Sequence, residues 1–287
     1  MNRKEALKKI TGASIATMLA PQVMADQEVH QKILSDKVNH SVCKWCYPDI
    51  PLEEMCEKVK DYGMSSIELL GPQEWPIIQR YGLGCAMGNP ATFSLTEGFN
   101  DPAQHAQLQE VYSALIPEAA EAGLTNVICF SGNRNGISDE QGLENCAIGL
   151  DPLVKLAEQY NITVCMELLN SKVDHIDYQC DHTSWGAALA EKLGRSSFKL
   201  LYDIYHMQIM EGDVIRTIRD NQQYIAHYHT GGVPGRNEID QSQELNYRAI
   251  VEAIVATGFE GHIAQEFIPK AEKPLVSLKK AIEICDV

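Results

Sequence analysis

The sequence has no stretch of 18 or more continuous apolar residues, so it lacks a segment that could cross a bilayer as a helix. Basic residues are also scarce, because 24 Lys and Arg stand against 39 Asp and Glu and give a formal net charge of -15. Nucleic-acid binding depends on clustered Lys and Arg, and no basic stripe occurs beyond the first ten residues, so the charge argues against a nucleic-acid partner. With 45% hydrophobic and 22% charged residues, the composition is typical of a soluble globular protein.

The first 25 residues differ from the rest. MNRKEALKKI carries four basic residues, TGASIATMLA is mildly apolar, and Val23-Met24-Ala25 resembles a cleavage site. This pattern predicts an export signal over residues 1–25, similar to a twin-arginine leader in which lysine replaces one arginine. The mature protein would then be periplasmic or otherwise exported, with no membrane contact after processing. The alternative is an amphipathic first helix that caps the domain of a cytoplasmic protein.

The nine cysteines form no recognisable disulfide framework. Their number is odd, and Cys129 and Cys165 fall inside apolar runs that read as buried strands, so we expect reduced core thiols. Cys43 and Cys46 form a C-x-x-C, but no second such pair follows. An incidental pair is therefore favoured over a zinc or redox site. Folding in the cytoplasm before export would reconcile reduced cysteines with a leader.

Beyond the leader, short apolar runs alternate with helical patterns in eight units. Such alternation predicts a parallel sheet, and eight units over residues 26–287 match a single (β/α)8 TIM barrel. Gly63, Gly82, Gly123, Gly194 and Gly258 stand where the helices should end. A doubly wound open sheet is the alternative, but no G-x-G-x-x-G follows the first strand and no second domain is visible. The predicted strands are HSVCKW, SSIELLG, LGCAMG, NVICFSG, TVCMELLN, FKLLYDIYH, IAHYHTGG and HIAQEFIP.

The last four predicted strands each end in a charged or imidazole side chain: Glu167, Asp203, His229 and Glu266. A buried carboxylate is costly unless it is paired, hydrogen-bonded or bound to a metal. In a barrel the carboxyl ends of the strands meet at one mouth, so these side chains should converge. Three carboxylates and one imidazole suit Mn²⁺, Mg²⁺ or Co²⁺ better than a thiolate-bound structural zinc. The pattern predicts a site for one divalent cation.

The motifs MELLN, YDIYHMQ, HYHTGGVPGRNE, ELNY and AQEF occur in this order between Val38 and the C-terminus. In order and spacing the chain resembles the hydroxypyruvate isomerase-like branch of the xylose isomerase-like (AP endonuclease family 2 type) TIM-barrel superfamily. That superfamily also contains ketose 3-epimerases and inosose-processing enzymes. The resemblance implies that Glu167, Asp203, His229 and Glu266 hold the metal, and that Glu167 and Glu266 also act as acid and base. The isomerase branch commonly has Gln where this chain has His229, and the epimerases use histidine.

The activity expected from this resemblance is isomerisation of a sugar or small hydroxycarbonyl acid, with hydroxypyruvate to tartronate semialdehyde as the named reaction. A proton would move between adjacent carbons through an enediolate, between Glu167 and Glu266. The alternative enzymes are a ketose 3-epimerase and an inosose isomerase or dehydratase. A non-catalytic sugar-binding barrel is the alternative of another class, although such a barrel would not need two carboxylates poised as acid and base.

Four further residues are predicted to contact the substrate. His206 follows Asp203 by three residues and could hydrogen-bond a substrate oxygen, or pack over the rim. Arg236 follows a glycine-rich turn, and its planar fork suits a carboxylate or hydroxyls of the substrate, or an ion pair with Glu238 or Glu244. Trp45 and Trp75 lie at or just after the ends of the first two predicted strands and could wall the pocket. Aromatic residues at a barrel rim also suit contacts between copies of the chain, so a homo-oligomer is left open.

Overall fold

Six parallel strands form the inner layer of residues 34–287, which are the residues that the computed structural model describes. Their order in the sheet is β1-β6-β5-β4-β3-β2, and every neighbouring pair is parallel. Parallel neighbours require crossover connections, which the intervening helices supply. The strands are β1 (Asn39–Val42), β2 (Asn126–Cys129), β3 (Thr163–Glu167), β4 (Phe198–Asp203), β5 (Ile225–Thr230) and β6 (His262–Gln265).

Two extended segments, residues 65–71 and 83–88, close the ring between β1 and β2 through isolated parallel bridges. The backbone N–H of Glu68 donates to Val42 (2.9 Å), and the N–H of Gly88 donates to Asn126 (2.9 Å). Leu69 has a left-handed φ of 57°, which interrupts a regular strand at this point. The predicted TIM barrel is confirmed, but the continuous strands predicted at SSIELLG and LGCAMG are wrong.

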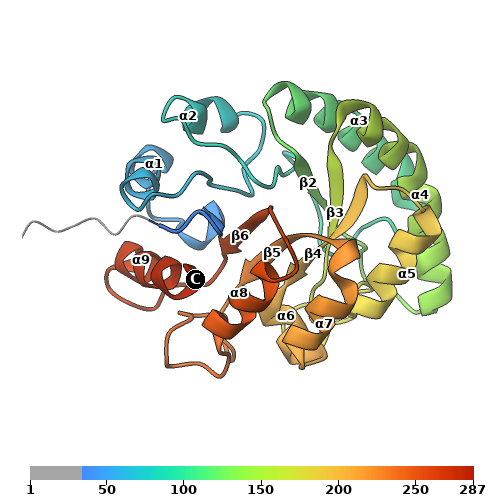
Figure 1. Ribbon diagram of the computed structural model, residues 1–287. Helices are drawn as coiled ribbons and strands as arrows, with labels where there is room; N and C mark the ends of the chain where they lie inside the picture. The colour runs from blue at the N-terminus through green and yellow to red at the C-terminus, as the bar shows by residue number, and fades with distance from the viewer. Residues whose placement is uncertain (1–33) are drawn as a thin grey trace, which may run out of the picture. The chain divides into compact units, whose positions relative to one another are not determined.

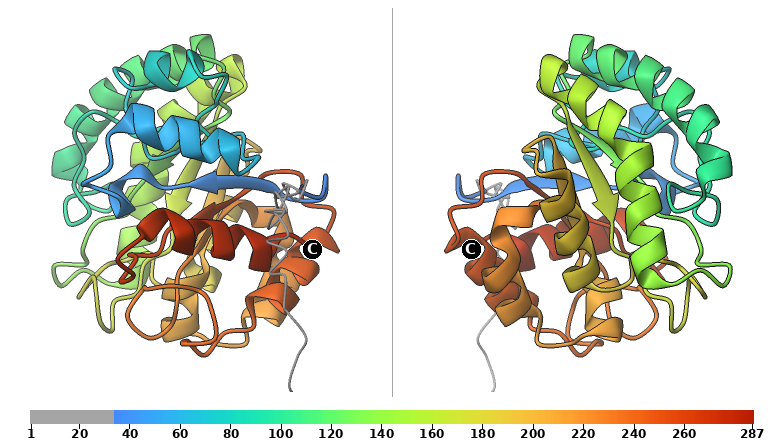
Figure 2. Two further views of the ribbon diagram at one scale, coloured as in Figure 1. Left: turned by 90° about the vertical axis from the view of Figure 1, so that its left-hand side faces the viewer. Right: turned by 90° about the vertical axis from the view of Figure 1, so that its right-hand side faces the viewer.

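The helices surround the strands as an outer layer (Figure 1). The last helix lies beside β1 (Figure 2). Next to them, the N–H of Ser35, which precedes β1, donates to the side chain of Asp286, which directly follows the helix (2.8 Å). The α-helices are α1 (Leu52–Asp61), α2 (Trp75–Gln79), α3 (His105–Glu121), α4 (Asp139–Tyr160), α5 (Thr183–Leu193), α6 (Ile204–Met210), α7 (Val214–Asn221), α8 (Tyr247–Val255) and α9 (Pro274–Cys285). Three 3₁₀ turns are η1 (Lys44–Cys46), η2 (Pro102–Gln104) and η3 (Gln222–Tyr224).

Helix α6 begins immediately after β4 and was not predicted. The side chain of Asp203 accepts a hydrogen bond from the backbone N–H of His206 (3.1 Å), which caps the first turn of this helix. The strand predicted at FKLLYDIYH therefore ends at Asp203, and His206 is helical. The glycines predicted to follow helices do so with positive φ, for example 62° at Gly194 after α5 and 80° at Gly258 after α8.

The cysteines in this barrel are all free and buried, which confirms Cys129 and Cys165 as core thiols. Cys43 and Cys46 are likewise free and buried. Across residues 34–287, none of the helices combines the length and the apolar character that a membrane crossing requires. The predicted export signal at residues 1–25 lies outside the described residues.

Candidate metal centre and active site

The four predicted metal ligands converge at the carboxyl ends of neighbouring strands. Glu167 ends β3, Asp203 ends β4, His229 lies at the end of β5, and Glu266 directly follows β6. In the strand register Asp203 stands opposite His229. All four residues are buried, and one ligand atom from each lies within 4.8 Å of those from the others. The barrel therefore brings residues distant in sequence to one point.

The contacts inside this cluster have the character of a cation site. Nδ1 of His229 lies 2.7 Å from Glu266 Oε2 and 3.2 Å from Glu167 Oε1. Neither this nitrogen nor Glu167 Oε1 has a hydrogen-bond partner among the described residues, although both are buried. Buried polar atoms that face one another without hydrogen bonds are costly. A divalent cation would satisfy them, and oxygen-rich ligands with one imidazole suit such a cation.

Arg236 supplies positive charge beside the cluster. Its Nη2 lies 2.9 Å from Asp203 Oδ2 and 2.5 Å from Glu266 Oε2, and its Nε donates to the backbone carbonyl of Glu266 (3.3 Å). The residue has a left-handed φ of 56°, in the glycine-rich turn that follows β5. The predicted alternative for Arg236 was a partner at Glu238 or Glu244, and the guanidinium instead faces two of the predicted metal ligands.

Burial and these charges move the pKa values of the three carboxyl groups in different directions. Burial raises the pKa of Asp203 to about 7, against the opposing effect of Arg236. Burial also raises the pKa of Glu167. Burial would raise the pKa of Glu266 too, but the charges of Arg236 and His229 outweigh it and lower that pKa well below its usual value. The cluster therefore holds carboxyl groups in unlike electrostatic environments.

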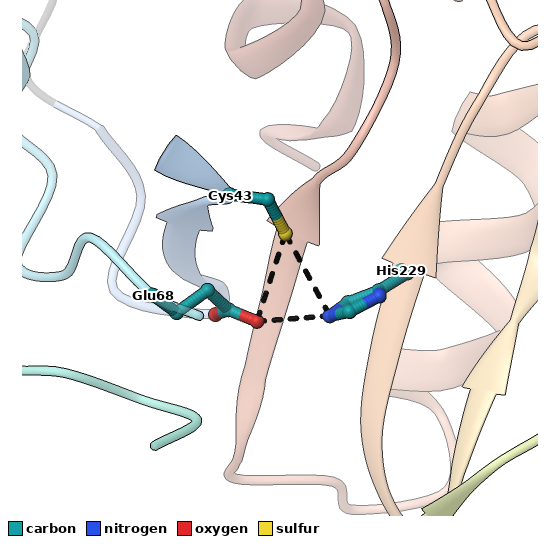
Figure 3. Close-up of side chains that lie close together, drawn as sticks. All are labelled: Cys43, Glu68 and His229. Atoms are coloured by element: carbon teal, nitrogen blue, oxygen red, sulfur yellow. Dashed lines mark hydrogen bonds and ion pairs between the residues drawn. The ribbon is translucent and has the colours of Figure 1, made fainter. Parts of the chain in front are cut away.

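Glu68 is a buried carboxylate that sequence reasoning missed. Its Oε1 lies 2.9 Å from Nε2 of His229 and 2.8 Å from Nε2 of His227, and Cys43 Sγ lies 3.9 Å from the same oxygen and 3.8 Å from His229 (Figure 3). Burial would raise the pKa of Glu68, but the two histidines lower it strongly. An ionised Glu68 can only accept a hydrogen bond from His229 Nε2–H. In the neutral imidazole that a metal would require, the Nδ1 lone pair would therefore face Glu167 and Glu266.

Glu68 and Cys43 contact His229 at Nε2, whereas Glu167 and Glu266 lie at Nδ1 of the same ring. The only sequence signal was a charged residue inside the apolar run SSIELLG. The histidine partners lie on β5, far along the chain, so nothing local marked Glu68 as part of the site. A carboxylate that fixes the ring of a histidine ligand is a recurrent feature of metal centres.

A cavity of about 440 Å³ opens from the cluster, and Trp45, Glu167, Arg236 and Glu266 are among its lining residues. Trp45 Nε1 donates to Glu266 Oε1 (2.7 Å), and the guanidinium of Arg236 lies 5.3 Å from the centre of the Trp45 ring. The structure thus places two of the predicted substrate contacts, Trp45 and Arg236, beside the two glutamates.

The other two predicted substrate contacts, His206 and Trp75, lie away from the cavity lining. Nδ1 of His206 accepts from the backbone N–H of Asn170 (3.1 Å), and its Nε2 lies 2.9 Å from Nη1 of Arg236. The side chain of Trp75 is 1% exposed, and its indole N–H donates to the carbonyl of Leu70 (2.9 Å). Trp75 packs in the core, and His206 contacts Arg236. A direct role toward substrate stays a prediction for both.

A family model described as a xylose isomerase-like TIM barrel matches residues 56–285 of the chain. The chain is 26% identical over 173 residues to the hydroxypyruvate isomerase of Escherichia coli K12, which covers 59% of this chain and 65% of that protein. It is 24% identical over 239 residues to the 2-oxo-tetronate isomerase of Pectobacterium atrosepticum, across 79% of this chain and 90% of that protein. Among solved structures, an AP endonuclease of family 2 from Brucella melitensis has a TM-score of 0.76 at 19% identity, across 84% of this chain and 97% of that one. These matches confirm the resemblance drawn from the strand-end motifs.

Proposed function

The chain belongs to the xylose isomerase-like TIM-barrel family, and from that premise we propose that it is a divalent-metal-dependent isomerase of a hydroxycarbonyl compound. The observation that carries the proposal is the convergence of Glu167, Asp203, His229 and Glu266 next to a cavity. Relatives named hydroxypyruvate isomerase and 2-oxo-tetronate isomerase support this class of reaction. Their substrates share a hydroxyl group and a carbonyl group on adjacent carbons.

The four converging residues would hold one cation, for which Mn²⁺, Mg²⁺ and Co²⁺ are the candidates. When bound, the cation would polarise the substrate carbonyl and stabilise negative charge on the two substrate oxygens. Glu68 holds the ring of His229 so that Nδ1 faces the cluster. Asp203 is fixed by the backbone of α6.

Glu167 and Glu266 are the candidates for acid and base. They belong to different strands, and both line the cavity. One carboxylate would take the proton from the carbon that bears the hydroxyl group, and the other would protonate the adjacent carbon as the carbonyl and hydroxyl oxygens exchange roles. The N–H of Trp45 holds Glu266 in place.

Hydroxypyruvate is the reference substrate, because it carries a hydroxyl group and a carbonyl group on adjacent carbons. Relatives of the chain are also named for this compound. The second candidate reaction is 3-epimerisation of a ketose, in which the same two carboxylates would act on opposite faces of one carbon. It is favoured by His229, since histidine is the residue that the sequence resemblance associates with the epimerases. A sugar-binding barrel without catalysis is disfavoured by the presence of both Glu167 and Glu266 at the cavity.

Solvent isotope exchange tests the proposal directly. The protein is loaded separately with Mn²⁺, Mg²⁺ or Co²⁺ and incubated in D₂O with hydroxypyruvate or a free ketose, and deuterium at the carbon next to the carbonyl is followed. We expect exchange that requires the cation and stops when a chelator removes it. Binding without exchange would identify a sugar-binding barrel. Exchange that persists after complete metal removal would contradict the metal-dependent mechanism.

A further inference from the structure

The guanidinium of Arg236 contacts the same carboxylate oxygens that a cation would need. Its Nη2 lies 2.9 Å from Oδ2 of Asp203 and 2.5 Å from Oε2 of Glu266. The other oxygen of each carboxyl group is engaged elsewhere. Oδ1 of Asp203 accepts from the backbone N–H of His206 (3.1 Å), and Oε1 of Glu266 accepts from the indole N–H of Trp45 (2.7 Å). Oδ2 and Oε2 are therefore the two oxygens that remain for a metal ion.

The guanidinium and a divalent cation cannot hold these two oxygens together. Divalent cations such as Mg²⁺ bind carboxylate oxygens at about 2 Å, so an ion bound to Oδ2 and Oε2 would lie against Nη2, which contacts both. Positive charges at such a separation repel each other strongly in a buried site of low dielectric constant. Oε2 of Glu266 also lies 2.7 Å from Nδ1 of His229, so this oxygen faces the remaining ligands. Binding of the cation therefore requires the guanidinium to leave.

The contact between Arg236 and His206 disfavours the guanidinium in this position. Nδ1 of His206 accepts from the backbone N–H of Asn170 (3.1 Å), and its Nε2 lies 2.9 Å from Nη1 of Arg236. Both of these neighbours can only donate. With Nδ1 accepting, Nε2 carries a proton in the neutral ring and in the protonated ring alike, so an N–H of His206 meets an N–H of Arg236. Two buried donors that face each other without an acceptor cost free energy.

The backbone of Arg236 is fixed, whereas its side chain has room to move. The backbone N–H of Arg236 donates to Gly232 (2.8 Å), and its carbonyl accepts from the N–H of Ile268 (2.6 Å). The guanidinium lies 5.3 Å from the centre of the Trp45 ring and 5.4 Å from that of the Tyr205 ring, and Arg236 lines the cavity of about 440 Å³. Aromatic rings attract a cation within about 6 Å. A rotation about the side-chain bonds is therefore enough to move the charge from the carboxylates toward the cavity.

We propose that Arg236 is a built-in competitor of the divalent cation, which holds Asp203 and Glu266 together until a metal ion displaces it. This inference rests on the proposed metal-dependent function and adds a regulation of the same site. In the metal-free protein the guanidinium compensates two buried carboxylates that would otherwise be costly. On metal binding it turns toward the cavity. Arg236 thus lowers the affinity for the cation and preserves the ligand cluster when the cation dissociates.

A pair of variants tests the competition by calorimetric titration of the metal-free protein with Mn²⁺. Arg236→Met keeps a long side chain and removes the charge and every donor. It should bind Mn²⁺ at least about tenfold more tightly than the wild type, because two charge-assisted hydrogen bonds no longer have to break. Arg134→Met is the matched control, since Arg134 bridges Asp139 (3.0 Å) and Asp181 (2.9 Å) outside the metal cluster. It should bind Mn²⁺ as the wild type does.

An arginine that only orients the ligands would have the opposite effect on this titration. Its removal would loosen the carboxylates and weaken metal binding. Unchanged or weaker binding of Mn²⁺ by a folded Arg236→Met variant would therefore overturn the proposal.

Thermal denaturation of the same proteins provides a second readout. Without metal, Arg236→Met should melt below the wild type, because two buried carboxylates lose their counter-charge. Saturating Mn²⁺ should remove this difference, since the ion takes the place of the guanidinium and stabilises the folded state. Arg134→Met should melt below the wild type by the same amount with and without Mn²⁺. A difference between Arg236→Met and the wild type that Mn²⁺ does not reduce would contradict the exchange.

Crystals of the wild type test the exchange without a substitution. After treatment with a chelator, Nη2 of Arg236 should contact Asp203 and Glu266, and after soaking with Mg²⁺ it should lie beyond hydrogen-bond distance of both oxygens. A guanidinium that keeps both contacts beside the bound ion would overturn the proposal even if Arg236→Met fails to fold. Wild-type protein that binds none of Mn²⁺, Mg²⁺ and Co²⁺ would overturn the metal-dependent function together with this inference. Metal binding without competition would overturn the inference alone.

Discussion

Replacement of Glu68 by glutamine tests how the barrel prepares His229 for a metal. Glu68 is fully buried, and its Oε1 lies 2.9 Å from Nε2 of His229. Glutamine keeps the size and one carbonyl oxygen, so the ring can stay in place, but the negative charge that makes the imidazole a better ligand is lost. Losses of this kind typically weaken metal binding by about 10 to 100-fold. Since the glutamine oxygen can still accept the N–H, we expect a loss near the lower limit, about tenfold or 1.4 kcal/mol.

Calorimetric titration of the metal-free protein with Mn²⁺ measures this effect without reference to activity. Glu74→Gln is the matched control, because it makes the same chemical change a few residues further along the chain, where Glu74 accepts from the backbone N–H of Gly71 (2.9 Å). It should bind Mn²⁺ as the wild type does, and circular dichroism should show both variants folded. A folded Glu68→Gln variant with wild-type affinity would refute the role given to Glu68.

Three other predictions concern the metal, the histidine ligand and the leader. A metal ion that binds only the folded state should raise the melting temperature. Asp203→Asn should remove most of that increase. Equal increases in the variant and the wild type would exclude Asp203 as a ligand. His229→Gln should still bind metal and turn over substrate, with altered preference, because the related isomerases commonly have Gln there; complete loss of metal binding in calorimetry would contradict this. Mass spectrometry of protein from its native host should find an N-terminus near Asp26, whereas a chain that starts at Met1 would show that residues 1–25 are retained.

The convergence of the four strand-end residues could be predicted because each is marked by local sequence. Each of Glu167, Asp203 and Glu266 puts a carboxylate at the end of an apolar run, where burial without compensation is costly. A parallel barrel brings all such ends to one mouth, so the architecture alone was enough to bring them together with His229. The same reasoning could not find Glu68, because its neighbours His227 and His229 are distant in sequence and only the closed ring brings them into contact.

The direction of individual side chains near the rim could not be predicted either. Trp75 follows a segment in which Leu69 has a left-handed backbone, and the indole turns into the core to bond the carbonyl of Leu70. His206 lies in a helix whose first turn is capped by Asp203. The apolar lining of the cavity was also missed, since Phe93 and Phe130 come from separate connections with no shared motif.

Proton abstraction by Glu167 and Glu266 is the central claim, and deuterium exchange in their glutamine variants tests it most directly. Glutamine keeps an oxygen donor but cannot accept the proton, so Glu167→Gln and Glu266→Gln should each lower exchange by about 10² to 10⁴-fold. Metal affinity, measured in parallel by titration, should fall far less. This result would assign proton transfer to the two carboxylates. Full exchange at the wild-type rate in both metal-loaded variants would contradict the mechanism.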